Sequence, residues 1–422
     1  MCFNYYRFCS PLWGRYILFF SRLRFYFCSI SFCFLGSLQA QVESDERPLL
    51  VTTNGIGFKK DSVFLMNLRF RMQNRFGYYS TLDAKDEAGF EAMVRRLRLR
   101  LDGYVLSPKI GYYIQLSFSR NDQELNSGTI AQTVRDAMAY YHFNKNFYIG
   151  LGQGKLPGNR ERVISSGNLQ FPDRSIANSV FTLDRDAGFF AYKTFEPGKG
   201  KQQIQLKAAI TGGEGRGQLY STTGLAYTGR VEWLPMGRFT NLGDYSEGDL
   251  EFEKTPKLSI GVSYCYNDGT VRSGGQLGST LPNAVDMKTL ISDLMFKYSG
   301  WGAMGEFFYR TIGDFEYTPS NTLAMNRIPT GTGFNFHLSR MLARKHEVAL
   351  RYAGVTPEKG FQDWQYRWRT KAVGYTYYLN KHRVKFQYYF GLDERYNPGT
   401  VPGLLHNLDN RISTMVQVEL GI

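Results

Sequence analysis

The stretch that most constrains the fold runs from Glu91 to Ser119, where apolar and polar side chains alternate. Successive side chains of a strand point to opposite faces, so such a stretch has two chemically distinct sides. One side carries Leu97, Leu99 and Leu101, and the other carries Arg96, Arg98 and Arg100. A soluble sandwich also alternates, with its apolar side in a core and its arginines in bulk water. In a membrane barrel the same pattern puts lipid outside and a charged, aqueous lumen inside.

The composition disfavours a helical membrane protein. The chain is 16% aromatic, yet its mean hydropathy is −0.35. A membrane-spanning helix needs about 20 consecutive apolar residues, and no such run follows position 40. A barrel places its hydrophobic residues at every second position, so low mean hydropathy with many aromatics suits it.

The charge is strongly positive, at +14 for 422 residues. Four of the arginines lie in the first 40 residues, which contain no acid, so the remainder carries +10. Such a charge suits nucleic acid, an anionic surface or an anion-conducting interior. Nucleic acid is disfavoured because the arginines alternate with lipid-type residues and form no basic helix or known binding module.

Residues 1–40 are predicted to be a signal peptide, with a long basic start, an apolar stretch over Phe25–Leu38 and Leu38-Gln39-Ala40 before Gln41. An N-terminal membrane anchor is disfavoured because the uninterrupted apolar segment is short. Four of the five cysteines fall in this leader, which leaves Cys265 alone. We therefore expect no disulfide within one mature chain. Lipidation at Cys33 is disfavoured by the bulky Phe32 before it.

The alternation predicts one all-β domain over residues 61–422, preceded by a polar segment at 41–60 without a strand. Sixteen strands are expected, close to 61–76, 91–105, 110–119, 133–143, 147–155, 187–195, 203–211, 224–234, 257–266, 288–298, 301–310, 332–341, 347–353, 371–379, 383–390 and 412–422. An even number lets both chain ends lie on one rim and closes the last strand against the first, which removes the exposed edge. Residues 77–90 and 267–286 are expected to be loops.

The connections between these strands alternate in length. Short links near Ser107, Asn144 and Ser299 alternate with long ones, as expected when only one rim of a barrel faces the periplasm. The acidic link from Pro235 to Thr255 breaks this rule. The longest connection, Leu156 to Asp186, is rich in Gly, Ser, Pro and Arg, and structureless loops of this size are usually functional.

Several segments, spread over most of the chain after residue 90, have a recognisable order and spacing: VRRLRLRLDG (94–103), DAMAYYHF (136–143), GLGQGKLPGNRE (150–161), LDRDAGFFAYKTF (183–195), TGRVEWLPMG (228–237), DLMFKYSGWGAMGEFFYR (293–310) and VGYTYYLNKHRVKFQYYF (373–390). Together they resemble the phosphate-selective porin family of Gram-negative outer membranes. The resemblance implies a 16-stranded antiparallel transmembrane β-barrel with long extracellular loops, usually trimeric. It also implies a third extracellular loop that folds inward and narrows the pore, and residues 156–186 occupy that position.

The residues suggest how an anion would pass. An oxyanion that leaves water needs replacement donors and positive potential along its path, which arginine supplies. We predict a pore-lining anion ladder of Arg69, Arg71, Arg75, Arg96, Arg98 and Arg100, and constriction-loop candidates Lys155, Arg160, Arg162 and Arg174. Asp173, Asp184 and Asp186 are expected to hold the loop by pairing with basic residues.

An alternative interpretation gives these charged residues no direct role in transport, because charged side chains on a water-exposed face are often only solvated or paired. Asp102, Asp136, Glu232 and Glu306 have the placement to neutralise much of the ladder. Tyr112, Tyr264, Tyr298, Tyr309 and Tyr388 are interpreted as a lipid-interface girdle or packing residues, not as a stacking track for sugars.

The leading hypothesis is therefore an outer-membrane porin that passes phosphate or similar small oxyanions by passive diffusion. Its partners would be outer-membrane lipid, the transported anions and, as a homotrimer, two further copies of the chain. The alternative is a barrel whose loops bind an envelope or polysaccharide partner, with conduction incidental. A barrel hydrolase is the least supported, because the five histidines are scattered and no catalytic, metal or phosphate-cradling motif is present. We expect no enzyme activity, cofactor or metal.

Overall fold

The computed structural model describes residues 49–51, 55–82, 88–120, 133–198, 201–217, 224–313, 328–359, 365–396 and 409–422. The chain divides into two units, Met1–Arg47 and Pro48–Ile422, and all described residues belong to the second. The predicted signal peptide and most of the polar segment at 41–60 lie outside the described residues.

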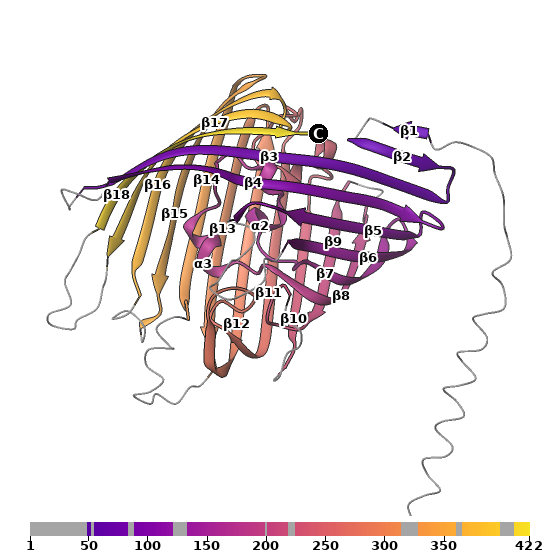
Figure 1. The fold of residues 1–422 in the computed structure, drawn as a ribbon, viewed down its shortest axis with the longest axis horizontal. Helices are drawn as coiled ribbons and strands as arrows, with labels where there is room; N and C mark the ends of the chain where they lie inside the picture. The colour runs from indigo at the N-terminus through magenta and orange to yellow at the C-terminus, as the bar shows by residue number, and fades with distance from the viewer. Residues whose placement is uncertain are drawn as a thin grey trace, which may run out of the picture. The chain divides into compact units, whose positions relative to one another are not determined.

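The described part of the chain contains a closed antiparallel barrel of sixteen strands, β3 to β18 (Figure 1). The strands are β3 (Phe64–Thr81), β4 (Ala88–Val105), β5 (Ile110–Ser117), β6 (Val134–Asn144), β7 (Phe147–Lys155), β8 (Arg185–Phe195), β9 (Gln203–Thr211), β10 (Ala226–Leu234), β11 (Lys257–Arg272), β12 (Thr280–Tyr298), β13 (Trp301–Ile312), β14 (Gly331–Ala343), β15 (His346–Pro357), β16 (Arg367–Asn380), β17 (Val384–Tyr396) and β18 (Asp409–Gly421). The predicted fold is confirmed.

The barrel closes where β18 pairs with β3, for example at Val416 opposite Phe76. Closure gives each of the sixteen barrel strands two neighbours, so the described part of the barrel has no open edge of backbone N–H and C=O groups facing lipid. The short helical elements are α2 (Arg160–Val163), η2 (Ser166–Asn168), α3 (Ile176–Phe181) and η3 (Thr240–Tyr245). No helix among the described residues is long and apolar enough to cross a membrane.

The polarity of the barrel is inverted relative to a soluble protein. Large apolar side chains such as Val231, Leu294 and Phe307 are exposed on the outer face, whereas Gln73, Glu306 and Asn335 are buried inside. Exposed apolar surface on this scale requires a nonpolar environment. The outer face also carries Tyr264, Tyr298, Tyr309 and Tyr388, while Tyr112 is half-buried.

Three local predictions were wrong. Two strands precede position 61, β1 (Leu49–Val51) and β2 (Ile56–Lys60), because β2 pairs with the first residues of β3 beyond the point where β18 ends. Residues 77–90 are not one loop, since β3 continues to Thr81 and β4 begins at Ala88. Residues 267–286 are mostly strand, and pairing of β11 with β12 continues through a register shift near Asn267.

The two rims of the barrel differ in their connections. One rim, here called the turn rim, carries the links β4–β5, β6–β7, β8–β9, β12–β13, β14–β15 and β16–β17, of two to seven residues each. The opposite rim, here called the loop rim, carries the long connection between β7 and β8. The connection between β10 and β11 is the exception, because it is long and belongs to the turn rim.

A charge on the outer face should destabilise this barrel. Leu350 on β15 is half exposed and pairs directly with Leu338 on β14. We expect Leu350→Arg to reduce the free energy of unfolding by about 2–4 kcal/mol, because a guanidinium would enter hydrocarbon. Urea unfolding in lipid vesicles measures this, with Leu350→Met as the control. Equal stability of the two variants would contradict a lipid-facing outer wall.

Candidate functional site

The connection between β7 and β8 lies inside the barrel. Its residues contact side chains from strands on several sides of the lumen: Arg71 on β3 donates to Ser165 Oγ at 2.9 Å, and Arg351 on β15 donates to Glu161 Oε1 at 2.9 Å. Lys385 on β17 donates to the Leu169 carbonyl at 2.6 Å. Figure 1 shows α2 and α3 enclosed by the ring of strands. Residues 156–184 are therefore called the inner loop.

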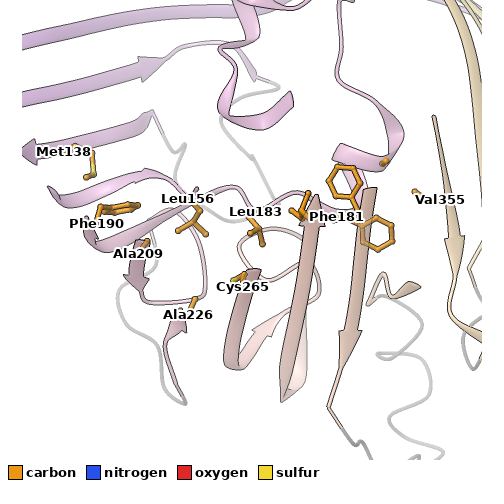
Figure 2. Close-up of a cluster of buried hydrophobic side chains, with 12 residues drawn as sticks. Met138, Leu156, Phe181, Leu183, Phe190, Ala209, Ala226, Cys265 and Val355 are labelled. Carbon is orange, nitrogen blue, oxygen red and sulfur yellow. The ribbon is translucent and has the colours of Figure 1, made fainter. Parts of the chain in front are cut away.

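Apolar contacts hold the two ends of the inner loop and α3 against the wall. Figure 2 shows Leu156 and Leu183 beside Cys265 of β11, with Phe181 at the end of α3. The Phe181 ring stacks on Phe308 of β13, with centroids 6.2 Å apart. Gly333 on β14 makes room for this ring, because a Cβ at that position would lie 2.8 Å from it. α3 begins where the Ser175 side chain accepts a hydrogen bond from Asn178 N, a standard N-cap.

A carboxylate fixes the middle of the inner loop to the arginine-rich strands. Asp173 accepts hydrogen bonds from Arg75 on β3 and from Arg95 and Arg96 on β4. Burial alone would raise the pKa of Asp173, but these three guanidinium groups lower it below its ordinary value of 3.8. Asp173 thus acts in the way predicted from sequence. Asp184 likewise pairs with Arg162 and Arg185.

Asp186 differs from this expectation. Its carboxylate accepts hydrogen bonds from the backbone N–H groups of Gly213 and Ala187, at 2.6 and 2.9 Å. It therefore braces the start of β8 against the β9–β10 connection, and the pairing partner is backbone rather than a basic side chain.

Arg160 is buried in a cluster of charged side chains. Its Nε lies 3.1 Å from Asp293 Oδ1, and Arg230 contacts both Asp293 and Glu232 at 2.6 Å. All four of these side chains are fully buried. Lys207 adds a third cation, 2.8 Å from Glu232, and removing one member of the cluster would leave a buried charge with less compensation. The structure thus places Arg160 in the support of the inner loop, away from the cavities described below.

A second buried network surrounds Glu161, which the sequence analysis did not single out. Glu161 accepts hydrogen bonds from Arg351 and from the Ser175 hydroxyl, the latter at 2.6 Å. Its own N–H donates to Glu306 Oε1 at 2.8 Å, and Asn335 donates to the same Glu306 carboxyl at 3.0 Å. Glu306, Asn335 and Arg351 occupy the alternate positions of their strands that face the lumen. That placement is the sequence signal that indicates such a role.

The long turn-rim connection, residues 235–256, also enters the barrel and meets the inner loop. Glu247 N donates to the Asn168 carbonyl at 2.9 Å, and Gln170 N donates to Glu247 Oε2 at 2.7 Å. Lys297 on β12 holds this connection by donating to the Gly243 and Ser246 carbonyls. The lumen is therefore narrowed from both rims.

A cavity of about 270 Å³ remains between the inner loop and the wall formed by β4 to β8. Its described lining includes seven basic side chains and one acid: Arg98, Arg100, Arg135, Lys155, Arg162, Arg174, Arg185 and Asp136. Asp136 is held by Arg185 through two hydrogen bonds of 2.8 and 3.1 Å. We call this the basic cavity. Its excess of cations favours an anion.

Five of the ten predicted site residues line the basic cavity: Arg98, Arg100, Lys155, Arg162 and Arg174. Arg71, Arg75 and Arg96 contact the inner loop, as Arg98 also does by donating to Ser166 Oγ at 2.8 Å. Arg69 and Arg100 both lie beside Asp102, at 3.6 and 2.8 Å. In the β3–β4 register Arg71 stands opposite Arg98 and Arg69 opposite Arg100. The two arginine rows are neighbours, as expected, and both rows contact the inner loop and Asp102. Arg135 and Arg185 were not predicted as site residues, although apolar and polar side chains also alternate along their strands.

The pKa values of two arginines in the inner loop are consistent with this excess of cations. Burial and neighbouring arginines lower the pKa of Arg162, and burial lowers that of Arg174. Asp184 already supplies one anion to Arg162, and a further anion in the basic cavity would favour the charged form of both guanidinium groups. Arg174 also donates to the Glu161 and Ile164 carbonyls, at 2.7 and 2.9 Å, so its position is fixed by the loop backbone.

A larger cavity, of about 460 Å³, adjoins the basic cavity on its turn-rim side. The two share Lys155, Val163 and Tyr192 in their linings. Its other lining residues include Lys145 and Asn146 of the β6–β7 turn, Lys207 of β9 and Arg238. We call this the exit cavity. The two cavities are adjacent along the β4–β9 wall, and both are lined by several basic side chains.

The sequence of residues 66–249 matches the family model of the phosphate-selective porins O and P. The predicted resemblance to this family is confirmed over this stretch. No curated protein sequence matches this chain.

Solved structures agree on the fold. An anion-selective porin from Comamonas acidovorans superposes with a TM-score of 0.53 at 12% identity, over 85% of this chain and 99% of that one. The outer membrane channel DcaP of Acinetobacter baumannii gives 0.52 at 13% identity, over 86% and 99%. OprB of Pseudomonas putida gives 0.51 at 10% identity, over 85% and 94%. At these identities the likeness shows that the fold is that of porins.

Removing the carboxylate of Asp173 should loosen the inner loop. Asp173→Asn leaves Arg75, Arg95 and Arg96 without their common anion. Because the Asp173 side chain is about one-third exposed (35%), we expect the free energy that holds the inner loop in place to fall by about 1–2 kcal/mol. Single-channel recording should show larger current fluctuations. Glu394→Gln, which removes an acid of similar exposure that pairs with Lys371 away from the inner loop, is the control. Equally quiet channels in both variants would contradict the anchoring role.

The contact between the two inward segments should weaken as pH rises. Burial and repulsion from Glu161 raise the pKa of Glu247 to about 7 from an ordinary value of 4.5. The folded protein thus holds this proton more tightly, and its contribution to stability is complete below about 4.5 and is lost as pH rises through 7. We expect more current fluctuation at pH 8.5 than at pH 5.5.

The variant Glu247→Gln, which cannot ionise, isolates this effect. It should flatten the part of the pH response between pH 5.5 and 8.5, because the amide still accepts the Gln170 N–H bond. A pH response of the same size in the variant would assign the effect to other groups.

Proposed function

We propose that the chain forms a water-filled outer-membrane channel that passes phosphate or similar small oxyanions by passive diffusion. The observation that carries this proposal is the basic cavity, where seven cations and one acid line a passage inside a barrel of porin fold. The family match and the fold favour a channel over an enzyme and over a barrel whose loops bind an envelope partner.

The passage would replace the hydration of the anion step by step. An oxyanion that enters from the loop rim meets the guanidinium groups of Arg98 and Arg100, then Arg162, Arg174 and Lys155. Alternate positions along a strand lie roughly 6.6–6.8 Å apart, so an anion can contact the next donor before it leaves the last. No energy source or cofactor is needed for this movement, because a concentration gradient drives it.

The remaining predicted arginines support this path. Arg71, Arg75 and Arg96 position the inner loop through Ser165 and Asp173. They therefore act on selectivity through the loop and add to the positive potential of the wall. Arg160, with its buried counterions, has the same supporting role.

The matching family and the anion-selective porin from Comamonas acidovorans both support an anion as the solute, and the family supports phosphate. The family also supports a Gram-negative outer membrane, with the apolar outer face in contact with its lipid. We extend the proposal to a homotrimer, as the family resemblance implies, and native mass spectrometry of the detergent-solubilised protein tests that assembly.

Replacing the ladder residues that line the cavity should reduce anion preference. Arg98→Gln with Arg100→Gln removes two charges from the passage, and we expect the anion-to-cation permeability ratio to fall about fivefold or more. The reversal potential in planar bilayers under a potassium chloride gradient measures the ratio. Lys109→Gln with Arg344→Gln, two exposed turn-rim cations, is the control. An unchanged ratio in the cavity variant would refute the proposal.

A further inference from the structure

Three basic side chains follow one another on the outer face of β16, at its loop-rim end. They are Arg367, Arg369 and Lys371, while Thr370 and Ala372 between and beyond them are buried on the inner face. β16 lies between β15 and β17 in the barrel wall (Figure 1). The lumen arginines described above face the opposite way. We call Arg367, Arg369 and Lys371 the outer basic cluster.

The guanidinium group of Arg369 lies across β15. Its Nη1 donates to the Val355 carbonyl at 2.8 Å, and its Nη2 donates to Thr356 Oγ1 at 3.0 Å. A Cβ at Gly354 would lie 2.6 Å from Arg369 Nη1, so this glycine leaves the space that the guanidinium occupies. The same group lies over the Phe334 ring of β14, with Cζ 5.1 Å from the ring centroid. All these partners are neutral, so they fix the position of the charge without neutralising it.

Glu394 of β17 is the acid that pairs with the outer basic cluster. It stands opposite Arg369 in the β16–β17 register, but its carboxylate lies 2.6 Å from Lys371 Nζ. Within the part of the chain that the structure describes, neither Arg367 nor Arg369 forms an ion pair with a carboxylate. Three positive charges and one negative charge therefore leave an excess of two positive charges on this part of the outer face.

The surroundings of this excess charge are those of a lipid interface. A cation on the outer wall of a barrel is costly at the bilayer midplane and nearly neutral in free energy close to the headgroups. The cluster lies at the end of its strand, and below it the outer face exposes apolar side chains such as Val373, Leu350 and Phe336. The barrel wall also separates the cluster from anions in the lumen. Repulsion between its like charges would therefore be relieved by an anion that approaches from the membrane side.

We propose that the outer basic cluster binds a membrane lipid whose headgroup carries a phosphate monoester, in the leaflet at the loop rim. A phosphate monoester carries about −1.5 to −2 charges near pH 7, which matches the excess of two positive charges, whereas a phosphodiester carries a single negative charge. Arg367 and Arg369 are two positions apart, roughly 6.6–6.8 Å, so one phosphate group can accept hydrogen bonds from both guanidinium groups.

The acyl chains of such a lipid would cover the apolar side chains below the cluster, among them Val373 and Leu350. A free phosphate ion gains nothing from that surface, which is why the structure favours a lipid as the occupant. The site faces away from the basic cavity. This inference therefore goes beyond the proposed function and does not depend on which anion the channel passes.

Native mass spectrometry of the detergent-solubilised protein tests this preference. The protein is titrated with phosphatidic acid, a phosphate monoester, and with phosphatidylglycerol, a phosphodiester that has the same acyl chains. In the natural protein we expect phosphatidic acid to bind about three- to fivefold more tightly than phosphatidylglycerol. A parallel titration in the presence of excess inorganic phosphate shows whether the free ion competes for the same site.

Variants assign the effect to the outer basic cluster. Arg367→Gln with Arg369→Gln should bring the ratio of the two lipid affinities close to one. Arg367→Gln alone, at an exposed position, should lower the ratio without disturbing the contacts of Arg369. Lys288→Gln with Arg340→Gln is the matched control, because it removes two outward-facing cations from β12 and β14. A shift in gel mobility between unheated and heated samples checks that each barrel has folded.

A preference for phosphatidic acid that is lost in the Arg367 and Arg369 variants and kept in the control supports the lipid site. Equal binding of the two lipids by the natural protein, a preference that survives both variants, or an equal loss in the control would overturn it. Complete displacement of phosphatidic acid by an equal concentration of inorganic phosphate would assign the site to the free ion and also overturn it.

The anion-to-cation permeability ratio keeps this inference separate from the proposed function. It should be the same in the Arg367→Gln, Arg369→Gln variant as in the natural protein, because both side chains lie outside the lumen. A lower ratio together with unchanged lipid binding would place these arginines in the path of the anion and overturn the lipid site.

Discussion

Fixed positive charge on the β3–β4 wall has to be balanced, and the rest of the interior depends on that balance. The register places Arg71 opposite Arg98 and Arg69 opposite Arg100, so like charges face each other across a hairpin. Such pairs are unfavourable unless other groups compensate. Compensation comes from Asp102 on the same wall, from Glu419 near the chain end and from Asp173 of the inner loop. The loop is thus held in the lumen partly because the wall needs its carboxylate.

This arrangement divides the basic residues into two groups. Arginines whose counterions are fixed, such as Arg75, Arg160 and Arg230, have their donors occupied and serve the architecture. The basic cavity is lined by cations that outnumber the acids in reach, and there an anion gains the most. A count of lumen arginines therefore overstates the number that contact a solute.

The barrel fold could be predicted from the sequence because the alternation within each strand identifies its two faces. Alternation around Leu97 and Arg98 fixed the outward and inward sides, and the sixteen predicted strands all occur. It was insufficient for contacts across the lumen, because alternation says nothing of which distant segment a side chain meets. Arg351 of β15 meets Glu161 of the inner loop, and Arg160 is positioned by a loop with no periodicity. The outward positions of Arg367, Arg369 and Lys371 follow the same alternation as the lumen arginines and were open to prediction.

Entry of residues 235–256 from one rim and of the inner loop from the other has an electrical consequence. A membrane voltage falls mainly where a conductor is narrowest, because resistance is concentrated there. The two segments meet near Asn168 and Glu247, so the field should be focused over this short section instead of being spread across the bilayer. An ion beside Arg162 or Lys155 would then experience a steep gradient of electrical potential. The direction of current rectification would indicate which mouth of the channel lies closer to the narrow section.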